Sequence, residues 1–329
     1  MEINFYFRQK GSHFSIEKIF VGLAKAIGTD DCQVNALYCP FQSGKNLIAV
    51  FLNGLWALRD AKTINHISGE VHYLALFLPK NSCVLTIHDC LHLKSSRIRG
   101  LVYRFLWFYI PVRVARAVTV VSQETKSNLC RITGIPASKV QVIPDFVCDS
   151  FQFLPKQSFP PKPSFLVIGT GENKNIPRIL EAVKECRLHL RIIGKLSPSY
   201  LEQLEATGNE WNNAFNLTDQ AILKEYMECD AVPMPSLQEG FGMPIIEAQA
   251  IGRPVITSNI SPMNTIAGLG AILVDPQSVS SIRSAVKDLL SGKINRSERV
   301  EQGRLNVQRF RLSNIRKQYQ AVYRNLLQP

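Results

Sequence analysis

The sequence predicts an α/β protein made of two doubly wound, Rossmann-like parallel sheets that face each other across a cleft. Three observations support this fold class: a length of 329 residues, an alternation of short β-rich runs with helical patterns, and a proline-rich break between two such series. At about 150 residues per domain, two domains are expected. Strands that alternate with helices imply right-handed crossovers and parallel sheets covered on both faces.

The first series predicts an N-terminal domain over residues 1–150. Between the first two β-rich runs, apolar residues recur at helical spacing from Ile16 to Ile27, after Ser15, which suits a helix N-cap. The runs that predict strands lie at 3–7, 33–38, 63–67, 83–87, 117–121 and 140–143.

Residues 151–164 (FQFLPKQSFPPKPS) hold four prolines and no periodicity, which predicts a linker. Alternation then restarts and predicts a second domain over 165–311. Strands are expected at 165–168, 190–193, 231–234, 255–257 and 271–274, and helices at 176–186, at 220–228, from 244 onward and over most of 278–327.

Composition limits the class of protein. Hydrophobic content of 46% and charged content of 19% are those of a globular chain, and no apolar run reaches the ~20 residues of a membrane span. The N-terminus has no signal-peptide pattern, and the eight cysteines form no Cys-x-x-Cys pair, so we expect a cytoplasmic protein without a zinc site. The net charge of +12 indicates an anionic partner.

The most informative segment is 235–259, PSLQEGFGMPIIEAQAIGRPVITSN. Glu239 precedes a glycine-rich turn, and Glu247 lies just inside a helix that Pro244 can begin, since its missing N–H costs nothing there. Glycines let the backbone approach a ligand closely, and the helix start attracts anions. A diphosphate flanked by hydroxyls bonded to the two carboxylates fits this pattern; a loop with solvated glutamates is the plainer reading.

At these residues the sequence resembles a known family, the retaining family-4 glycosyltransferases (glycosyltransferase group 1) of the GT-B fold. Segment 235–259 is similar to the family's donor-site signature. The stretches 169–175 (GTGENKN), 86–89 (TIHD) and 118–134 (VTVVSQETKSNLCRITG) also fit, so the resemblance covers nearly the whole chain. It implies an acceptor-binding N-terminal domain, a nucleotide-sugar-binding C-terminal domain, and a last helix (312–329) that crosses back to the N-terminal domain.

The resemblance also implies residue roles. Glu239 should hold the transferred sugar near the reacting face as a catalytic carboxylate, and His88 should face that sugar from the N-terminal domain. Lys174 should neutralise the pyrophosphate, and Glu247 should bind the ribose hydroxyls. The backbone of residues Gly240, Phe241, Gly242 and Met243 should contact sugar and pyrophosphate. No cofactor or metal is implied, which agrees with the absence of an Asp-x-Asp motif.

Three departures from the family pattern concern phosphate, acceptor and nucleotide binding. The family's arginine before the lysine is replaced by Gly169-Thr170-Gly171, so Thr170, Arg178 or Lys195 is expected to supply that phosphate contact. The N-terminal loop, with the acceptor-side candidates Gly11, Ser12 and His13, has one glycine where many relatives have two. The family's Pro-Glu turn is Asn264-Thr265 here.

The stretch 94–131 holds eight basic residues and one acidic residue among several aromatics. It predicts either an element that contacts anionic lipid or a domain helix whose aromatics are core, and no nucleic-acid module accompanies it. Ser122 suits the N-cap of a helix from Gln123.

The predicted function is a retaining, metal-independent glycosyltransferase that moves a sugar from a UDP- or GDP-sugar to a saccharide or lipid-linked saccharide acceptor, in synthesis of cell-surface polysaccharide or glycoconjugate. It would work in the cytoplasm or at the inner face of the cell membrane, without nucleic acid. The alternatives are a nucleotide-sugar epimerase or hydrolase, and a non-catalytic nucleotide-sugar-binding protein.

Overall fold

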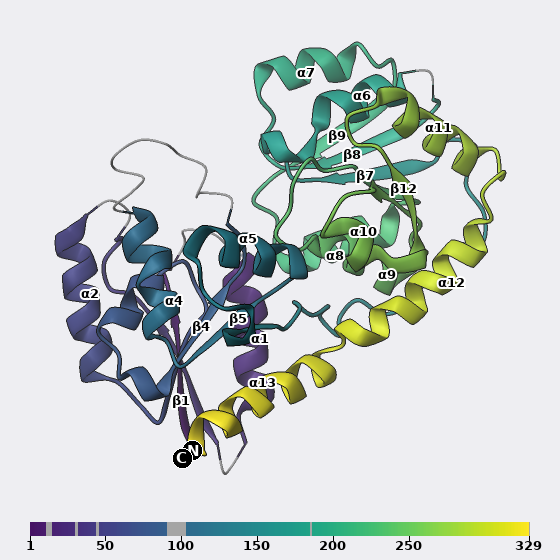
Figure 1. The fold of residues 1–329 in the computed structure, drawn as a ribbon. Coiled ribbons are helices and arrows are strands. Elements are labelled where there is room, and N and C mark those ends of the chain that lie inside the picture. Colours follow the sequence, from purple (N-terminus) through teal and green to yellow (C-terminus); the bar gives the residue numbers. More distant parts are fainter. Residues whose placement is uncertain (11–14, 30–31, 44–45, 91–102, 185, 329) are drawn as a thin grey trace. The chain divides into compact units, whose positions relative to one another are not determined.

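The computed structural model describes residues 1–329 except 11–14, 30–31, 44–45, 91–102, 185 and 329. Its contacts divide the chain into two compact units (Figure 1). The first unit is Met1–Phe146 with Leu312–Pro329, and the second is Val147–Arg311. None of the described helices is both long and apolar enough to cross a membrane.

The first unit contains a six-stranded, wholly parallel sheet in the order β2-β1-β3-β4-β5-β6. Its strands match the predicted runs to within a residue. They are β1 (Glu2–Phe7), β2 (Gln33–Tyr38), β3 (Ile64–Ile67), β4 (Cys83–Ile87), β5 (Ala117–Val120) and β6 (Val140–Val142). The helical elements are α1 (Ser15–Ile27), α2 (Leu47–Arg59), η1 (His72–Leu76), η2 (Lys80–Ser82), η4 (Phe105–Tyr109), α4 (Pro111–Val114), α5 (Gln123–Thr133), η5 (Ala137–Lys139) and α13 (Leu312–Leu327).

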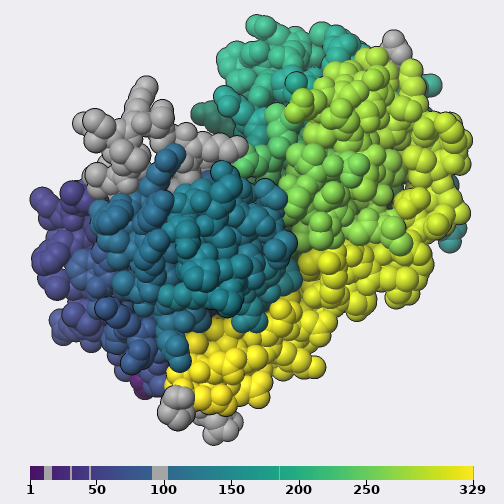
Figure 2. Space-filling model, in the orientation of Figure 1, coloured from purple at the N-terminus to yellow at the C-terminus, as the bar shows by residue number. Residues whose placement is uncertain are grey.

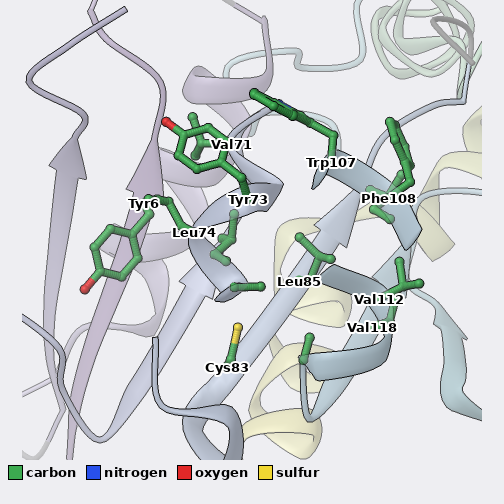
Figure 3. Packing of buried hydrophobic residues seen from close by; sticks show 14 of the residues in the cluster. Tyr6, Val71, Tyr73, Leu74, Cys83, Leu85, Trp107, Phe108, Val112 and Val118 are labelled. Carbon is green, nitrogen blue, oxygen red and sulfur yellow. The ribbon is translucent and has the colours of Figure 1, made fainter. Parts of the chain in front are cut away.

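Alternate residues of these strands face two different layers, as the two-residue period of a strand requires. On one face, Tyr6, Leu85 and Val118 join a core supplied by α2, η1, η4 and α4 (Figure 3). On the other face, His66 lies against α1 and α13: its Nδ1 is 2.7 Å from the Tyr323 hydroxyl. The C-terminal helix therefore completes the first sheet's second layer.

The second unit also consists of parallel strands covered by helices. Its strands are β7 (Ser164–Ile168), β8 (His189–Ile193), β9 (Glu210–Ala214), β10 (Val232–Met234), β11 (Val255–Ser258) and β12 (Ala271–Val274). A parallel bridge between Phe165 and Ala231 joins the two three-stranded halves, so the order is β9-β8-β7-β10-β11-β12. This is the order 3-2-1-4-5-6 of dinucleotide-binding folds, with its switch point between β7 and β10. Two Rossmann-like units confirm the predicted fold class.

The second unit's helical elements are η6 (Glu172–Lys174), α6 (Ile176–Val183), α7 (Pro198–Glu205), α8 (Asp219–Glu228), α9 (Met243–Ile251), α10 (Met263–Ala267), η7 (Gly268–Gly270), α11 (Val279–Leu290), α12 (Arg296–Val307) and η8 (Gln308–Phe310). Strand β9 was not predicted, because its sequence EWNNA is mostly polar.

The segment predicted as a linker packs onto the second unit. Phe151 is buried with its ring 5.3 Å from that of Tyr226, and the Leu154 N–H donates to the Ile251 carbonyl. Arg253 also holds this segment, because its buried guanidinium donates to the Leu154 carbonyl at 2.6 Å. The irregular backbone predicted from the prolines is present from residue 151 to 163. The domain boundaries given from the sequence stay predictions.

Candidate functional site

The candidate site of the second unit lies where its strand order reverses. Ligands of open parallel sheets bind beyond the carboxyl ends of the strands at such a point, because the loops leave in opposite directions there. The loop after β7 carries Thr170 and Lys174, and the loop after β10 carries Glu239 and the glycine-rich turn. Residues about 65 positions apart in sequence therefore meet at the edge shared by two neighbouring strands.

Lys174 and Glu239 form an ion pair in this structure. The Lys174 Nζ lies 2.7 Å from the Glu239 Oε1, and the two side chains are 19% and 12% exposed. The Asn173 side chain donates to the Gln238 carbonyl at 3.0 Å, and the Asn173 carbonyl accepts from the Leu237 N–H at 2.8 Å. The loop residues directly before Lys174 and Glu239 are thus bonded to each other, and both side chains of the ion pair keep some exposure to solvent.

Asn175 fixes the shape of the loop after β7, and sequence reasoning did not identify it. Its backbone is left-handed (φ 61°), and its buried side chain donates to the carbonyls of Pro235 (2.9 Å) and Pro276 (2.7 Å). Asparagine tolerates this conformation better than most residues, since its short amide can bond locally. One side chain therefore ties three loops together; its position directly before a helix-starting Ile-Pro was the available signal.

The turn before α9 is built as the sequence predicts, with Gly242 as N-cap and Pro244 in the first turn. Gly242 has φ +110°, and a Cβ there would lie 3.1 Å from the Ile245 Cδ1. The Phe241 side chain is buried against the Phe310 ring at 5.6 Å, so it can offer only its backbone to a ligand. Met243 is half-buried at the helix start. The turn leads directly into the positive end of a nine-residue helix, which favours an anion.

Glu247 is held by a buried tyrosine that sequence reasoning missed. The Tyr226 hydroxyl of α8 donates to the Glu247 Oε2 at 2.6 Å. Burial, together with the nearby Glu247 charge, raises the pKa of Tyr226 well above its usual value, so the phenol keeps its proton and stays a donor. Glu247 is half-buried on the first turns of α9, with its carboxylate oriented by this bond.

The three candidates for the missing phosphate-binding arginine have different surroundings. The Thr170 hydroxyl donates to the Lys195 carbonyl at 2.8 Å. Arg178 donates to the Asn175 Oδ1 at 2.9 Å and so supports the loop. Lys195 lies two residues after the end of β8, and its side chain is exposed. Of the three, Lys195 offers a solvent-exposed ammonium group beside the loop that carries Thr170.

In the first unit, His88 directly follows β4, and its side chain is 10% exposed. Its Nε2 is 2.9 Å from the Ser68 carbonyl, which can only accept, so Nε2 carries a proton. Its Nδ1 faces the Asp145 Oδ1 at 3.9 Å. Burial lowers the pKa of His88 to about 4 and raises the pKa of Asp145 to about 7. A neutral imidazole is therefore fixed at the end of β4.

An ion-pair cluster lies close by, at the ends of β1 and β3. Arg8 pairs with Glu17 (Nε–Oε1 2.6 Å) and with Glu70 (NH1–Oε2 2.8 Å). The acceptor-side candidates Gly11, Ser12 and His13 lie outside the described residues.

The predicted lipid-contacting stretch 94–131 falls partly outside the described residues. Where it is described, Trp107 and Phe108 are buried in the first unit's core, and Tyr103 stacks on Trp107. Phe105 remains 55% exposed. Ser122 is the N-cap of α5, accepting from the Thr125 N–H at 3.1 Å, as predicted. Most described aromatics of this stretch thus belong to the core.

Comparison with known families gives two adjoining matches. Residues 151–306 match the family described as "Glycosyl transferases group 1", and residues 33–151 match "Glycosyltransferase Family 4". Together they span most of the chain and meet at residue 151.

Among curated proteins, the chain is 27% identical to the O-antigen chain mannosyltransferase RfbU of Salmonella typhimurium, over 62% of this chain and 60% of that protein. It is 27% identical to O-antigen chain mannosyltransferase B of Escherichia coli, over 82% of this chain and 77% of that protein. The match to the Salmonella protein thus spans less than two thirds of that protein's length.

Solved structures of similar fold cover almost the whole chain. The glycosyltransferase from Rickettsia africae has a TM-score of 0.76 at 18% identity, over 99% of this chain and 98% of that chain. Anabaena Alr3699/HepE in complex with UDP and glucose has a TM-score of 0.79 at 16% identity, over 99% and 100%. At these identities the likeness concerns the fold.

Proposed function

Because this chain belongs to the family-4 glycosyltransferases of the GT-B fold, we propose that it transfers a sugar from a nucleotide-sugar donor with retention of anomeric configuration. The observation that carries the proposal is the Lys174–Glu239 pair at the switch point between β7 and β10. A cation for the diphosphate and a carboxylate for sugar hydroxyls stand there side by side, beside a helix start that favours anions.

In the proposed mechanism, the ion pair separates into two ligand contacts. Lys174 turns to the diphosphate and stabilises the charge that grows on the leaving nucleoside diphosphate, and Lys195 is the candidate for a second phosphate contact. Glu239 is then free to accept hydrogen bonds from the sugar hydroxyls, with the sugar positioned beside the Gly240–Met243 backbone. Glu247, oriented by Tyr226, accepts from the ribose hydroxyls. Cationic side chains and the start of α9 replace a metal in this scheme.

The donor class is proposed as a UDP- or GDP-sugar. UDP and glucose are bound by Alr3699/HepE, and the curated relatives include mannosyltransferases of O-antigen chains. By the same argument we propose a saccharide or lipid-linked saccharide acceptor in polysaccharide synthesis, held by the first unit, whose neutral His88 would contribute to sugar binding. We propose a cytoplasmic location, which the eight free cysteines support. We also propose peripheral contact with an anionic membrane.

The test is transfer from a panel of UDP- and GDP-hexoses to octyl glycosides, followed by NMR of the product. We expect release of nucleoside diphosphate, a new glycosidic bond, the donor's anomeric configuration and activity in EDTA. Glu239→Gln should lose at least 100-fold in kcat while keeping the wild-type Tm. Glu298→Gln, at an exposed position of α12, is the matched control.

Other outcomes would identify the alternatives. Free sugar without a glycosidic bond indicates a hydrolase, and a changed sugar still bound to nucleotide indicates an epimerase. Saturable nucleotide binding with no turnover of any donor indicates a binding protein. Full transfer by Glu239→Gln would remove this carboxylate from the mechanism.

A further inference from the structure

Helix α2 is oriented with its large apolar residues outward. Its buried positions are mostly small, and its exposed positions form a stripe at helical spacing. The buried residues are Ala49, Val50, Asn53, Gly54 and Ala57, and the stripe, here called the α2 apolar face, consists of Leu47, Ile48, Phe51, Leu52, Leu55 and Leu58. Ile48 is 70% exposed and Leu47 is 58% exposed.

Specific contacts lock this orientation. The Asn53 side chain donates to the Phe41 carbonyl at 2.8 Å and to the Tyr73 hydroxyl at 2.9 Å, and it accepts from the Phe41 N–H at 3.1 Å. A Cβ at Gly54 would lie 2.5 Å from the Phe77 ring, so only glycine permits the helix to approach η1 this closely. Rotating the helix to bury its large residues would break these bonds and press bulky side chains against Phe77.

The unit that carries this face is basic in its sequence. Within the sequence of the first unit there are 20 Lys and Arg against 9 Asp and Glu, whereas the second unit has 18 against 17. Nearly all of the net charge of +12 therefore belongs to the unit that carries α2. The helix itself has a single charge, Arg59 in its last turn. Monomeric proteins rarely expose a contiguous apolar stripe of this size without a binding role.

We propose that the α2 apolar face inserts into the interfacial region of an anionic lipid bilayer. An apolar stripe without hydrogen-bonding side chains suits acyl chains, and the net positive charge of the unit that carries it suits anionic headgroups. At ~1.5 Å per residue, the 13 residues of α2 extend ~20 Å, short of the ~30 Å hydrocarbon core, so the helix lies in the plane of the interface. Figures 1 and 2 show α2 on the outer surface of the first unit.

This inference assigns a surface to the membrane contact included in the proposed function, and it moves that contact from stretch 94–131 to α2. It does not depend on sugar transfer. A membrane-facing helix on the acceptor-binding unit would bring that unit to a lipid-linked acceptor.

The test is co-sedimentation of the full chain with vesicles of phosphatidylcholine alone or with 30% phosphatidylglycerol. The variant is Ile48→Gln/Phe51→Gln/Leu55→Gln, and the matched control is Leu154→Gln/Leu269→Gln/Leu305→Gln, three exposed leucines of the second unit. Because all six side chains are exposed, both variants should keep the wild-type circular dichroism and Tm.

We expect wild type and control to bind the anionic vesicles at least tenfold more tightly than the α2 variant, and to bind neutral vesicles weakly. Equal binding by the α2 variant, or no vesicle binding by wild type, would overturn the proposal. A wild-type dimer in light scattering that the α2 variant converts to monomer would instead make a second copy of the chain the occupant. Transfer to octyl glycosides by the α2 variant at the wild-type rate separates this test from that of the proposed function.

Discussion

Gly169→Ala perturbs the candidate site through backbone and side chain together. Gly169 is the first residue after β7, and its backbone is left-handed with φ +86°. A Cβ at this position would lie 2.9 Å from the Lys174 Cε and 3.2 Å from the Lys174 Cγ. A left-handed non-glycine residue costs about 1–2 kcal/mol. The methyl group also pushes the lysine stem away, so Lys174 can no longer hold its position beside Glu239.

Gly292→Ala separates these two effects. Gly292 has φ +76°, and nothing lies within 4 Å of its built Cβ, so this variant has the backbone strain alone. Both variants should lower the free energy of unfolding by about 1–2 kcal/mol, or Tm by about 2–8 °C for a unit of this size. Only Gly169→Ala should weaken nucleoside diphosphate binding, by about 10- to 100-fold, which corresponds to loss of one charge-assisted contact of about 1.5–3 kcal/mol.

Calorimetric titration with UDP and GDP measures the effect, and a double-mutant cycle locates it. In a Lys174→Ala background, Gly169→Ala should cost almost no further affinity, since the displaced side chain is already absent. Additive losses, or a Gly169→Ala protein that binds as tightly as Gly292→Ala, would refute the role given to Lys174.

Three further predictions concern buried groups. Tyr226→Phe removes the donor to Glu247 and should weaken nucleoside diphosphate binding several-fold with a loss of about 1–3 kcal/mol in stability; unchanged affinity would argue against Glu247 as a ligand group. Burial raises the pKa of Asp145 from 3.8 to about 7, so the buried carboxyl is tolerated in its neutral form. The stability that goes with this neutral form is fully present below about pH 4 and is lost as the pH rises through about 7. Asp145→Asn should therefore gain about 1–3 kcal/mol in urea unfolding at pH 8 and nothing at pH 4, whereas an equal effect at both pH values contradicts the assignment. Arg253→Leu strands buried backbone carbonyls and should cost about 3–5 kcal/mol of the second unit's stability in urea unfolding; a loss below 1 kcal/mol would show that water replaces the guanidinium.

Sequence periodicity was sufficient for most strands and for the location of the candidate loops, because buried parallel strands are nearly continuous apolar runs. Strand β9 escaped it, since its polar residues lie at the edge of the sheet. The residues Lys174 and Glu239 could be chosen from their motifs, but their pairing depends on β7 lying beside β10. Strand order is a long-range property that a local pattern does not contain.

Helix α2 illustrates a second limit. Its sequence, LIAVFLNGLWALR, is apolar on nearly every side, so periodicity cannot say which face is buried. Asn53 and Gly54 decide the orientation through contacts with distant residues. Similarly, the Tyr226–Glu247 bond joins two helices whose packing no sequence spacing reveals.

We propose that the donor nucleotide binds at the loops after β7 and β10. Hydrogen–deuterium exchange with and without saturating UDP or GDP, whichever raises Tm more, tests it directly. We expect slower exchange at residues 169–175 and 239–247. Protection confined to the first unit, or no protection at saturation, would contradict it.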